Sequence, residues 1–316
     1  MPRVEPLRAG GLAHALERGA REFLAGFPLA EHEGGLGILG GDMMWPFRRR
    51  RKKNRVAVVS IEGIITDTSF GASREHILQA LERVEEMKAR ALVVRINSPG
   101  GTVGACQEIH QAIRRLRQNR RIPVVASLGD VAASGGLYVA VACQKIVANP
   151  GTITGSIGVV LKANNLRGLY QKLGVESEVI KSGPYKDALS TFRPLTEEER
   201  ALLQEVIDDT YAQFVDAVAD GRGLSSESVR TVADGRIFTG QQAKAYGLVD
   251  ELGNVQRAVE LAAEMAGIVG KPVVVEAMPK KKRGLLARLF TRWRSFPEDA
   301  VLLTAWRGLP LWLMPI

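Results

Sequence analysis

The feature that most constrains this chain is a regular alternation of short apolar runs with amphipathic helical segments. Residues 56–61 and 91–96 are rich in Val and Ile, which is typical of buried strands. Residues 73–88 and 103–117 carry apolar side chains at helical spacing, and residues 123–127 form a further strand-like run. Strands that alternate with helices are joined by right-handed crossovers, so the sequence predicts an α/β fold with a parallel sheet.

The second half of the chain continues in the same manner. Thr196 and Glu199 form a capping-box pattern at the start of a long expected helix. We expect one folded domain over residues 55–278. Its further expected elements are helices at 134–142, 196–220, 225–233, 240–246 and 255–266 and strands at 145–148 and 271–277.

The net charge of +9 comes from two flanks of the chain. Arg48–Arg55 and Lys280–Arg294 each hold seven basic residues and no acidic one, and the rest of the chain carries a charge of −5. This distribution argues against a basic face for nucleic acid. Two interpretations of the flanks remain open: peripheral contact with an anionic membrane, and solvated tails.

We expect residues 1–54 to be a leader with little structure and residues 279–316 to be a basic amphipathic tail, a C-terminal helical extension of the domain. One hypothesis is that translation begins at Met43 or Met44. No run reaches the ~18–20 apolar residues that a membrane span requires, so we expect no anchor. The apolar face of the expected tail helix consists of Leu285, Leu286, Leu289, Phe290 and Trp293.

The cysteines and histidines do not suggest a metal site. Cys106 and Cys143 lie in expected core elements without metal-ligand spacing, which favours buried thiols in a reducing compartment. The four histidines are scattered along the chain. His76 and His110 fall within expected helices, where we interpret both as surface residues rather than as a catalytic base.

Two glycine-rich segments follow expected strands, at the sheet edge where parallel α/β folds place their active sites. Residues 97–101 end in Gly100-Gly101, whose N–H groups could face an oxyanion or simply form a turn. Residues 129–136 contain Ser134 among small residues, where a serine serves either as a nucleophile or as a helix N-cap. Each segment alone permits both interpretations.

A nucleophilic serine needs a base, and Lys186 lies in the turn Ser182–Asp187. A lysine in such a turn is most often a solvated surface charge, and it becomes a base only when its amine is neutral. Ser–Lys pairs are a known variant of the catalytic triad. The local sequence leaves both roles of Lys186 open.

Taken together, these motifs resemble the signal peptide peptidase A family, also called protease IV. The resemblance covers residues 55–270 and implies a ClpP/crotonase-like fold of repeated ββα units with a single catalytic domain. The motifs that carry it, in order, are residues 97–101, 132–136, 149–158 and 182–187, followed by residues 192–200 and 236–243.

The resemblance assigns roles to individual residues. It implies that Ser134 is the nucleophile and Lys186 the general base, with the N–H groups of Gly101 and Gly135 as the oxyanion hole. It implies that Ser156 orients the lysine, and that no cofactor or metal takes part.

The resemblance also implies partners. They are peptide substrates, which in the family are signal peptide remnants and unfolded proteins with small or apolar side chains at the scissile bond, and further copies of the chain in a dome- or bowl-shaped homo-oligomer with active sites partly built across subunits. Relatives often carry an N-terminal anchor, which we do not find here. We therefore expect a cytoplasmic enzyme that is peripheral to the membrane.

Two other functions remain as alternatives. One is a crotonase-type enzyme acting on an acyl-CoA thioester, which would share the fold but use carboxylates for proton transfer. The other is a non-catalytic membrane-associated scaffold. The pairing of Ser134 with Lys186 favours the peptidase over both.

Overall fold

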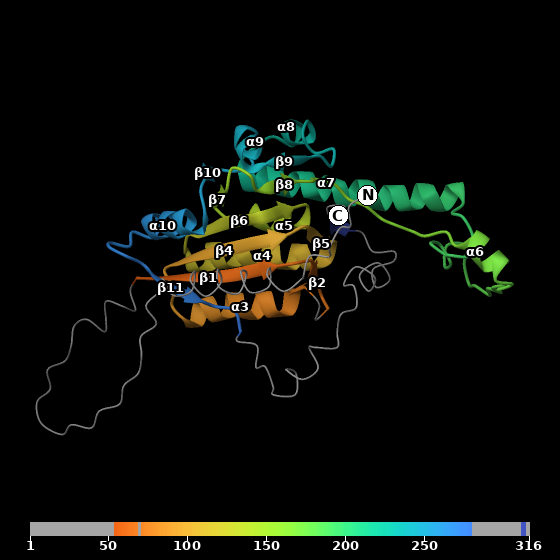
Figure 1. The fold of residues 1–316 in the computed structure, drawn as a ribbon, viewed down its shortest axis with the longest axis horizontal. Coiled ribbons are helices and arrows are strands. Elements are labelled where there is room, and N and C mark those ends of the chain that lie inside the picture. Colours follow the sequence, from red (N-terminus) through yellow and green to blue (C-terminus); the bar gives the residue numbers. More distant parts are fainter. Residues whose placement is uncertain (1–53, 69–70, 280–310, 314–316) are drawn as a thin grey trace, which may run out of the picture. The chain divides into compact units, whose positions relative to one another are not determined.

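The computed structural model describes residues 54–68 and 71–279, together with the backbone of residues 311–313 (Figure 1). The predicted alternation of strands and helices is confirmed. The long strands and helices at its start are β1 (Arg55–Glu62), α3 (Arg74–Glu86), β4 (Ala91–Ser98), α4 (Val103–Arg120) and β6 (Val124–Ala133). A short helix, α5 (Gly135–Ala140), begins directly after β6 and Ser134.

The main sheet confirms the predicted α/β fold. Its central path runs β10-β7-β6-β4-β1-β11, and every neighbouring pair along this path is parallel. The outer strands of this path are β7 (Lys145–Ala148), β10 (Glu251–Leu252) and β11 (Val273–Glu276). Two more strands, β8 (Ile153–Gly155) and β9 (Ile237–Thr239), extend the sheet beyond the end of β7, where β8 pairs with β6.

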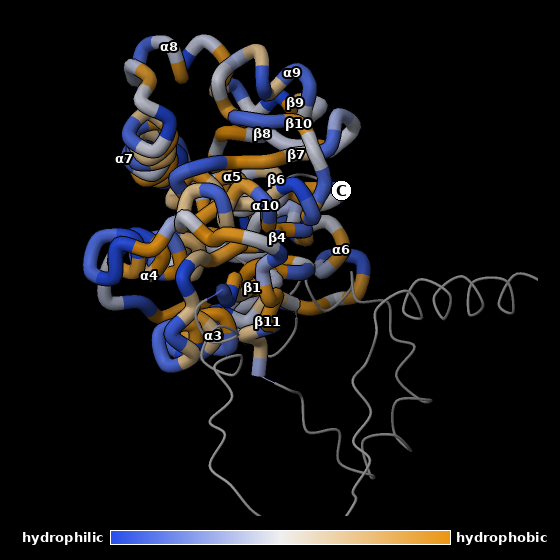
Figure 2. Tube along the Cα trace, turned by 90° about the vertical axis from the view of Figure 1, so that its left-hand side faces the viewer, coloured by the Kyte–Doolittle hydropathy of each residue, from blue (hydrophilic) through white to orange (hydrophobic). Residues whose placement is uncertain are grey.

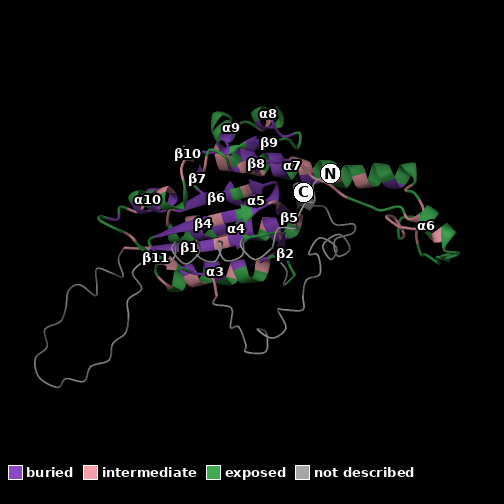
Figure 3. Ribbon diagram, in the orientation of Figure 1, coloured by how far each residue is buried: buried purple, intermediate pink, exposed green. Residues whose placement is uncertain are grey.

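Both faces of the sheet are buried, which explains why its strands are almost continuously apolar. Ala57 and Val59 belong to a core shared with α3, α4 and α5. Val56 and Val58 point to the other face, where they pack with α10 (Val255–Met265). Figures 2 and 3 show the resulting layers, with apolar, buried strands between helices whose outer surfaces are polar and exposed.

A second, smaller sheet lies at the carboxyl end of the first strands. Its order is β12-β5-β2-β3, with β2 at Ile65–Thr66, β3 at Ala72–Ser73, β5 at Gly100–Thr102 and β12 at Leu311–Leu313. The first repeat runs from β1 through β2 and β3 to α3, and the second from β4 through β5 to α4, as expected for ββα units. A Cβ at Gly101 would lie 1.9 Å from the carbonyl oxygen of Ile65, so only glycine allows β5 to approach β2 this closely.

The remaining helices are α6 (Arg167–Lys172), α7 (Glu197–Arg222), α8 (Ser226–Arg230) and α9 (Gly240–Ala245). The predicted capping box of Thr196 and Glu199 at the start of α7 is confirmed. The C-terminal half of α7 packs into the core through Phe214, Val215 and Val218. Its N-terminal half extends away from the sheets, and α6 lies beyond it (Figure 1). We call residues 160–196 the arm.

One boundary was predicted wrongly. The expected strand at residues 123–127 is too short, because residues 129–133 of the glycine-rich segment continue β6, where Ala132 pairs with Ser98 of β4 and residues 131–133 pair with β8. Gly129 is required by packing, since a Cβ there would lie 2.9 Å from the side chain of Asn97. The glycines that suggested a break therefore accommodate a neighbouring strand.

The predictions for the two ends of the chain lie largely outside the described residues. These are the leader (residues 1–54), the start at Met43 or Met44, and the amphipathic helix of the tail, so the proposed domain boundaries stay a prediction. Among the helices of residues 54–279, none is both long enough and apolar enough to cross a membrane.

Candidate active site

Ser134 lies at the end of β6 in a strained backbone conformation. Its φ is +51° and its ψ is −119°, which is uncommon for a residue with a side chain. Such a conformation costs on the order of 1–3 kcal/mol and persists only where the surroundings enforce it. Here the N–H of Ser134 donates to the carbonyl of Gly155 (2.8 Å), and its own carbonyl accepts from Tyr138 (2.9 Å). Strain of this kind is typical of functional sites.

The local structure also helps to decide whether Ser134 is a helix cap or a nucleophile. Ser134 occupies the N-cap position of α5, but its hydroxyl accepts no capping hydrogen bond. Only 1% of the residue is exposed. Its position is held by close packing, since a Cβ at Gly136 would lie 2.8 Å from the carbonyl of Ser98. A buried hydroxyl that does not cap its helix is available for chemistry.

Ser156 lies at the same edge of the sheet as Ser134. Ala133 and Gly155 are paired residues of the parallel strands β6 and β8, and each serine directly follows one of them. Ser156 has a φ of +52°, almost the same as Ser134, and its N–H donates to the carbonyl of Arg236 (2.8 Å). Neighbouring strands are about 4.8 Å apart, so the fold brings the two serines close together.

The two glycine segments also meet at this edge. Ser98 pairs with Ala132 across β4 and β6, just before Gly101 on one chain segment and Gly135 on the other. The hydroxyl of Ser98 accepts from the N–H of Gly100 (3.1 Å), which fixes the turn into β5. The structure therefore gathers Gly101, Gly135 and Ser134 in one region.

Within a single chain, Lys186 does not lie with Ser134, Ser156 and the two glycines. It is exposed and lies in a turn of the arm. In Figure 1 the segment that joins α6 to α7, which contains Lys186, lies beside α6 at the outer end of α7, away from α5 and β5. The structure of one chain thus brings together four of the five predicted site residues and leaves the predicted base apart from them.

A cavity of about 370 Å³ opens beside Ser156. Its wall is mostly apolar and includes Ile157, Val159 and Tyr211. Asp234 also contributes to this wall, and the hydrogen bonds that its carboxylate accepts from Arg236 lower its pKa to about 2. A cavity of this size and character can accept a small or medium apolar side chain.

Neither of the two histidines in the described part of the chain supplies a base at this edge. His76 is exposed, as predicted. The prediction for His110 was wrong, because His110 is buried, with its Nδ1 atom 2.8 Å from the carbonyl oxygen of Tyr138. Burial lowers its pKa. Cys106 and Cys143 are buried and unbridged, which confirms the interpretation of two buried thiols.

Two signals were missed from the sequence. The positive φ angles of Ser134 and Ser156 could not be predicted, because neither composition nor apolar periodicity depends on them. Asp187, Arg193 and Glu199 form ion pairs at the base of the arm, and only the capping role of Glu199 was visible in the sequence.

Comparison of the sequence with known proteins shows the family to which the chain belongs. The family model of peptidase family S49 matches residues 116–269. A candidate protease of Synechocystis sp. is 50% identical over 240 residues, which cover 76% of this chain and 84% of the relative. The chloroplastic serine protease SPPA of Arabidopsis thaliana is 36% identical over 77% of this chain and 34% of its own length.

A further relative is protease 4 of Salmonella typhi, which is 39% identical over 57% of this chain and 29% of its own length. The match to the Synechocystis protein spans most of both chains. The chain therefore belongs to peptidase family S49, the family of SppA and protease 4, and is a serine peptidase.

Proposed function

We propose that this peptidase is an endopeptidase with a Ser–Lys dyad, in which Ser134 is the nucleophile and Lys186 the general base. The observation that carries the proposal is the backbone of Ser134, held at positive φ with a buried hydroxyl that makes no cap. The backbone strain at Ser134 and the absence of a capping hydrogen bond at α5 both lower stability. A serine with a purely structural role would not be expected to show these two features.

In this proposal the dyad forms between two copies of the chain. The arm carries Lys186 away from its own Ser134 and exposes large apolar side chains to solvent. Ile180 is 97% exposed and Leu173 is 65% exposed. Contiguous exposed apolar groups favour association with another protein surface. We therefore propose a homo-oligomer in which the arm of one copy delivers its lysine to the serine of the next.

In this proposal the dyad acts through a covalent acyl-enzyme. The neutral amine of Lys186 takes the proton of Ser134 as the hydroxyl oxygen attacks the peptide carbonyl carbon. The carbonyl oxygen becomes an oxyanion, which the N–H groups of Gly101 and Gly135 stabilise; removing one such donor typically costs about 3–4 kcal/mol. The protonated lysine donates to the leaving amine. Water then attacks the carbonyl carbon of the acyl-enzyme while Lys186 accepts its proton. The ester bond to the oxygen of Ser134 breaks, the acid product leaves, and the lysine returns the proton to that oxygen, with Ser156 holding the amine in place.

We propose that the substrate binds as an extended strand along β5. The backbone of Gly100–Thr102 already pairs antiparallel with Leu311–Leu313, so this edge accepts an apolar peptide in extended form. The cavity beside Ser156 would receive one of its apolar side chains. The substrates that fit are signal peptide remnants and other apolar peptides released from membranes or from unfolded proteins.

The experiment that tests the dyad uses two inactive variants. Ser134→Ala and Lys186→Ala should each abolish cleavage of a chromogenic peptide with small apolar residues. Mixed subunits of the two variants, dissociated and reassembled together, should regain activity, because some sites then combine an intact serine with an intact lysine from a neighbour. Activity near the wild-type rate in either single variant would refute the dyad, and failure to complement would refute its division between copies.

Two further measurements define the substrate class. Turnover of an acyl-CoA thioester without peptide cleavage would favour a crotonase-type enzyme instead. Mass spectrometry of the wild-type chain beside Ser134→Ala would show whether the C-terminal tail is itself trimmed. Sedimentation with anionic vesicles, compared with neutral ones, tests the proposed peripheral membrane contact of the basic flanks.

A further inference from the structure

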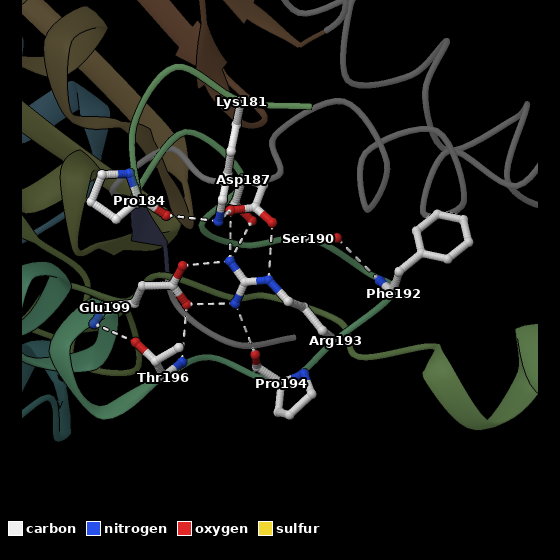
Figure 4. A network of polar contacts seen from close by, with 9 residues as sticks. All are labelled: Lys181, Pro184, Asp187, Ser190, Phe192, Arg193, Pro194, Thr196 and Glu199. Atoms are coloured by element: carbon white, nitrogen blue, oxygen red, sulfur yellow. Dashed lines mark hydrogen bonds and ion pairs between the residues drawn. The ribbon is translucent and has the colours of Figure 1, made fainter. Parts of the chain in front are cut away.

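A polar network joins the turn that carries Lys186 to the start of α7 (Figure 4). Asp187 directly follows Lys186 in the chain. The Nε and Nη2 atoms of Arg193 donate to the carboxylate of Asp187 at 3.0 and 2.8 Å. The Nη1 and Nη2 atoms of Arg193 donate to the carboxylate of Glu199 at 2.8 and 2.5 Å. One guanidinium group therefore bridges two carboxylates, each through two hydrogen bonds.

The Glu199 end of this bridge is anchored in the folded domain. Glu199 is only 2% exposed and lies in the first turn of α7. Its carboxylate also accepts from the N–H of Thr196 (2.9 Å), as part of the capping box. Because α7 continues into the core at Phe214, Glu199 has a fixed position relative to the sheet.

The Asp187 end holds the turn itself. The side chain of Asp187 is 15% exposed, and it also accepts from the Nζ atom of Lys181 (2.5 Å), which donates to the carbonyl of Pro184 (3.0 Å) as well. The backbone carbonyl of Asp187 accepts from Arg193 (3.2 Å). No helix or strand is present between α6 and α7, so these side-chain contacts replace the hydrogen-bond ladders that fix residues elsewhere in the described domain.

The network is also balanced in charge. Arg193 and Lys181 carry two positive charges, and Asp187 and Glu199 carry two negative ones. Hydrogen bonds from Arg193 hold the pKa of Asp187 well below its usual range and lower the pKa of Glu199 to about 2, so both are ionised at neutral pH. Glu198 adds a further negative charge nearby, since it lines one cavity together with Arg193 and Glu199. Without Arg193 these groups would leave an excess of negative charge beside Lys186, which stabilises a protonated amine.

We propose that Arg193 is a positioning residue for the general base. By fixing Asp187 against α7, it sets the direction in which Lys186 leaves the arm, and by neutralising Asp187 and Glu199 it keeps the amine able to accept a proton. This inference rests on the proposed function of Lys186 and adds a residue that does not itself touch the peptide.

The test compares three variants at this network. Arg193→Ala should lower kcat by about 100-fold, the cost typical of a misplaced catalytic group, and shift the rise of activity to higher pH. Arg193→Lys keeps the charge but cannot bridge two carboxylates, so kcat should fall with little change in the pH profile. Asp187→Asn removes a negative charge, and the rise of activity should move to lower pH. KM should stay within about twofold in all three, since ground-state binding is unchanged.

A matched control is available on α10, which packs on the other face of the sheet from α3, α4 and α5. Arg257 also bridges carboxylates, those of Glu251 and Glu264, and has a similar exposed fraction of 34% against 29% for Arg193. Arg257→Ala should leave kcat and the pH profile unchanged. Circular dichroism and size-exclusion chromatography identify any variant that fails to fold or assemble. If Arg193→Ala does not fold, the kinetics of Asp187→Asn test the inference instead.

Three outcomes would overturn the inference. One is that kcat in the folded, assembled variants equals that of the wild type while only the melting temperature falls. Another is that KM rises while kcat is unchanged, which would place Arg193 in substrate binding. The third is pH profiles that shift in the same direction for Arg193→Ala and Asp187→Asn. If Lys186→Ala retains activity, the proposed role of Lys186 as the base is refuted. If Lys186→Ala is inactive but the Arg193 variants are fully active, only the proposed role of Arg193 is refuted.

Discussion

The two halves of the proposed dyad are held in place by different physical means. Ser134 lies at the end of a buried strand, and its strained backbone is maintained by strand pairing and close apolar packing. Lys186 lies on an exposed arm without regular secondary structure around it, and ion pairs hold its turn. The proposed nucleophile is thus held by the core, whereas the turn of the proposed base is held by ion pairs at the surface. The difference predicts that the two regions respond differently to mutation, pH and assembly.

The largest expected effect is the loss of the nucleophile. Ser134→Ala should reduce peptide cleavage by at least about 10³-fold, as in other serine peptidases, without loss of cap energy, because the hydroxyl does not cap α5. Steady-state kinetics and urea unfolding together check this. A large fall in the free energy of unfolding would show that Ser134 has a structural role after all.

The next effect tests how tightly the core defines the oxyanion region. Gly101→Ala should destabilise the chain by about 2–4 kcal/mol, since a Cβ would lie 1.9 Å from the carbonyl oxygen of Ile65 and the backbone must move. Gly104→Ala is the control, because nothing lies within 4 Å of a Cβ there and the residue is in α4. It should be neutral or slightly stabilising by up to about 1 kcal/mol. Equal effects at both positions in urea unfolding would contradict the packing argument.

A smaller effect distinguishes the arm from the core by pH. The pKa values of Asp187 and Glu199 are lowered in the folded state, so their contribution is present above the unfolded values and is lost as pH falls. The window runs from about pH 5, above the ordinary carboxylate values, down toward about pH 2, the folded value of Glu199. Hydrogen exchange should increase in residues 181–199 across this window before it increases in β4 and β6. Simultaneous loss of protection in both regions would remove the distinction.

The smallest effect concerns the helix that supports the arm. Thr196→Ala removes a capping box and should cost about 1 kcal/mol, seen as a fall of a few degrees in melting temperature. Unlike Ser134, Thr196 does cap its helix through the N–H of Glu199 (3.2 Å). Thr196→Ser keeps the capping hydroxyl and should behave almost as the wild type. A similar loss of stability in both variants would show that the methyl group, not the cap, is responsible.

Much of the catalytic domain could be predicted from its local patterns. The strands β1, β4, β6 and β7, the amphipathic helices and the capping box of α7 follow from apolar periodicity and cap residues, which act over a few neighbouring positions. The end of β6 was misjudged, because glycines at positions such as Gly129 are needed for contact with another strand. His110 was misjudged for a similar reason, since α5 covers it and α5 contacts α4 only in the folded chain.

The sequence by itself determined the parallel α/β fold, the glycine segments at its active edge and the identities of Ser134, Lys186 and Ser156 as candidates. Only the tertiary structure decided that Ser134 is strained and does not cap its helix, that Ser156 lies beside it, and that Lys186 stands apart on an arm held by Arg193. The physical reason is that chemistry depends on distance and direction between residues far apart in the chain. Those are set by long-range packing and ion pairing, whereas the sequence pattern reports what each segment prefers locally.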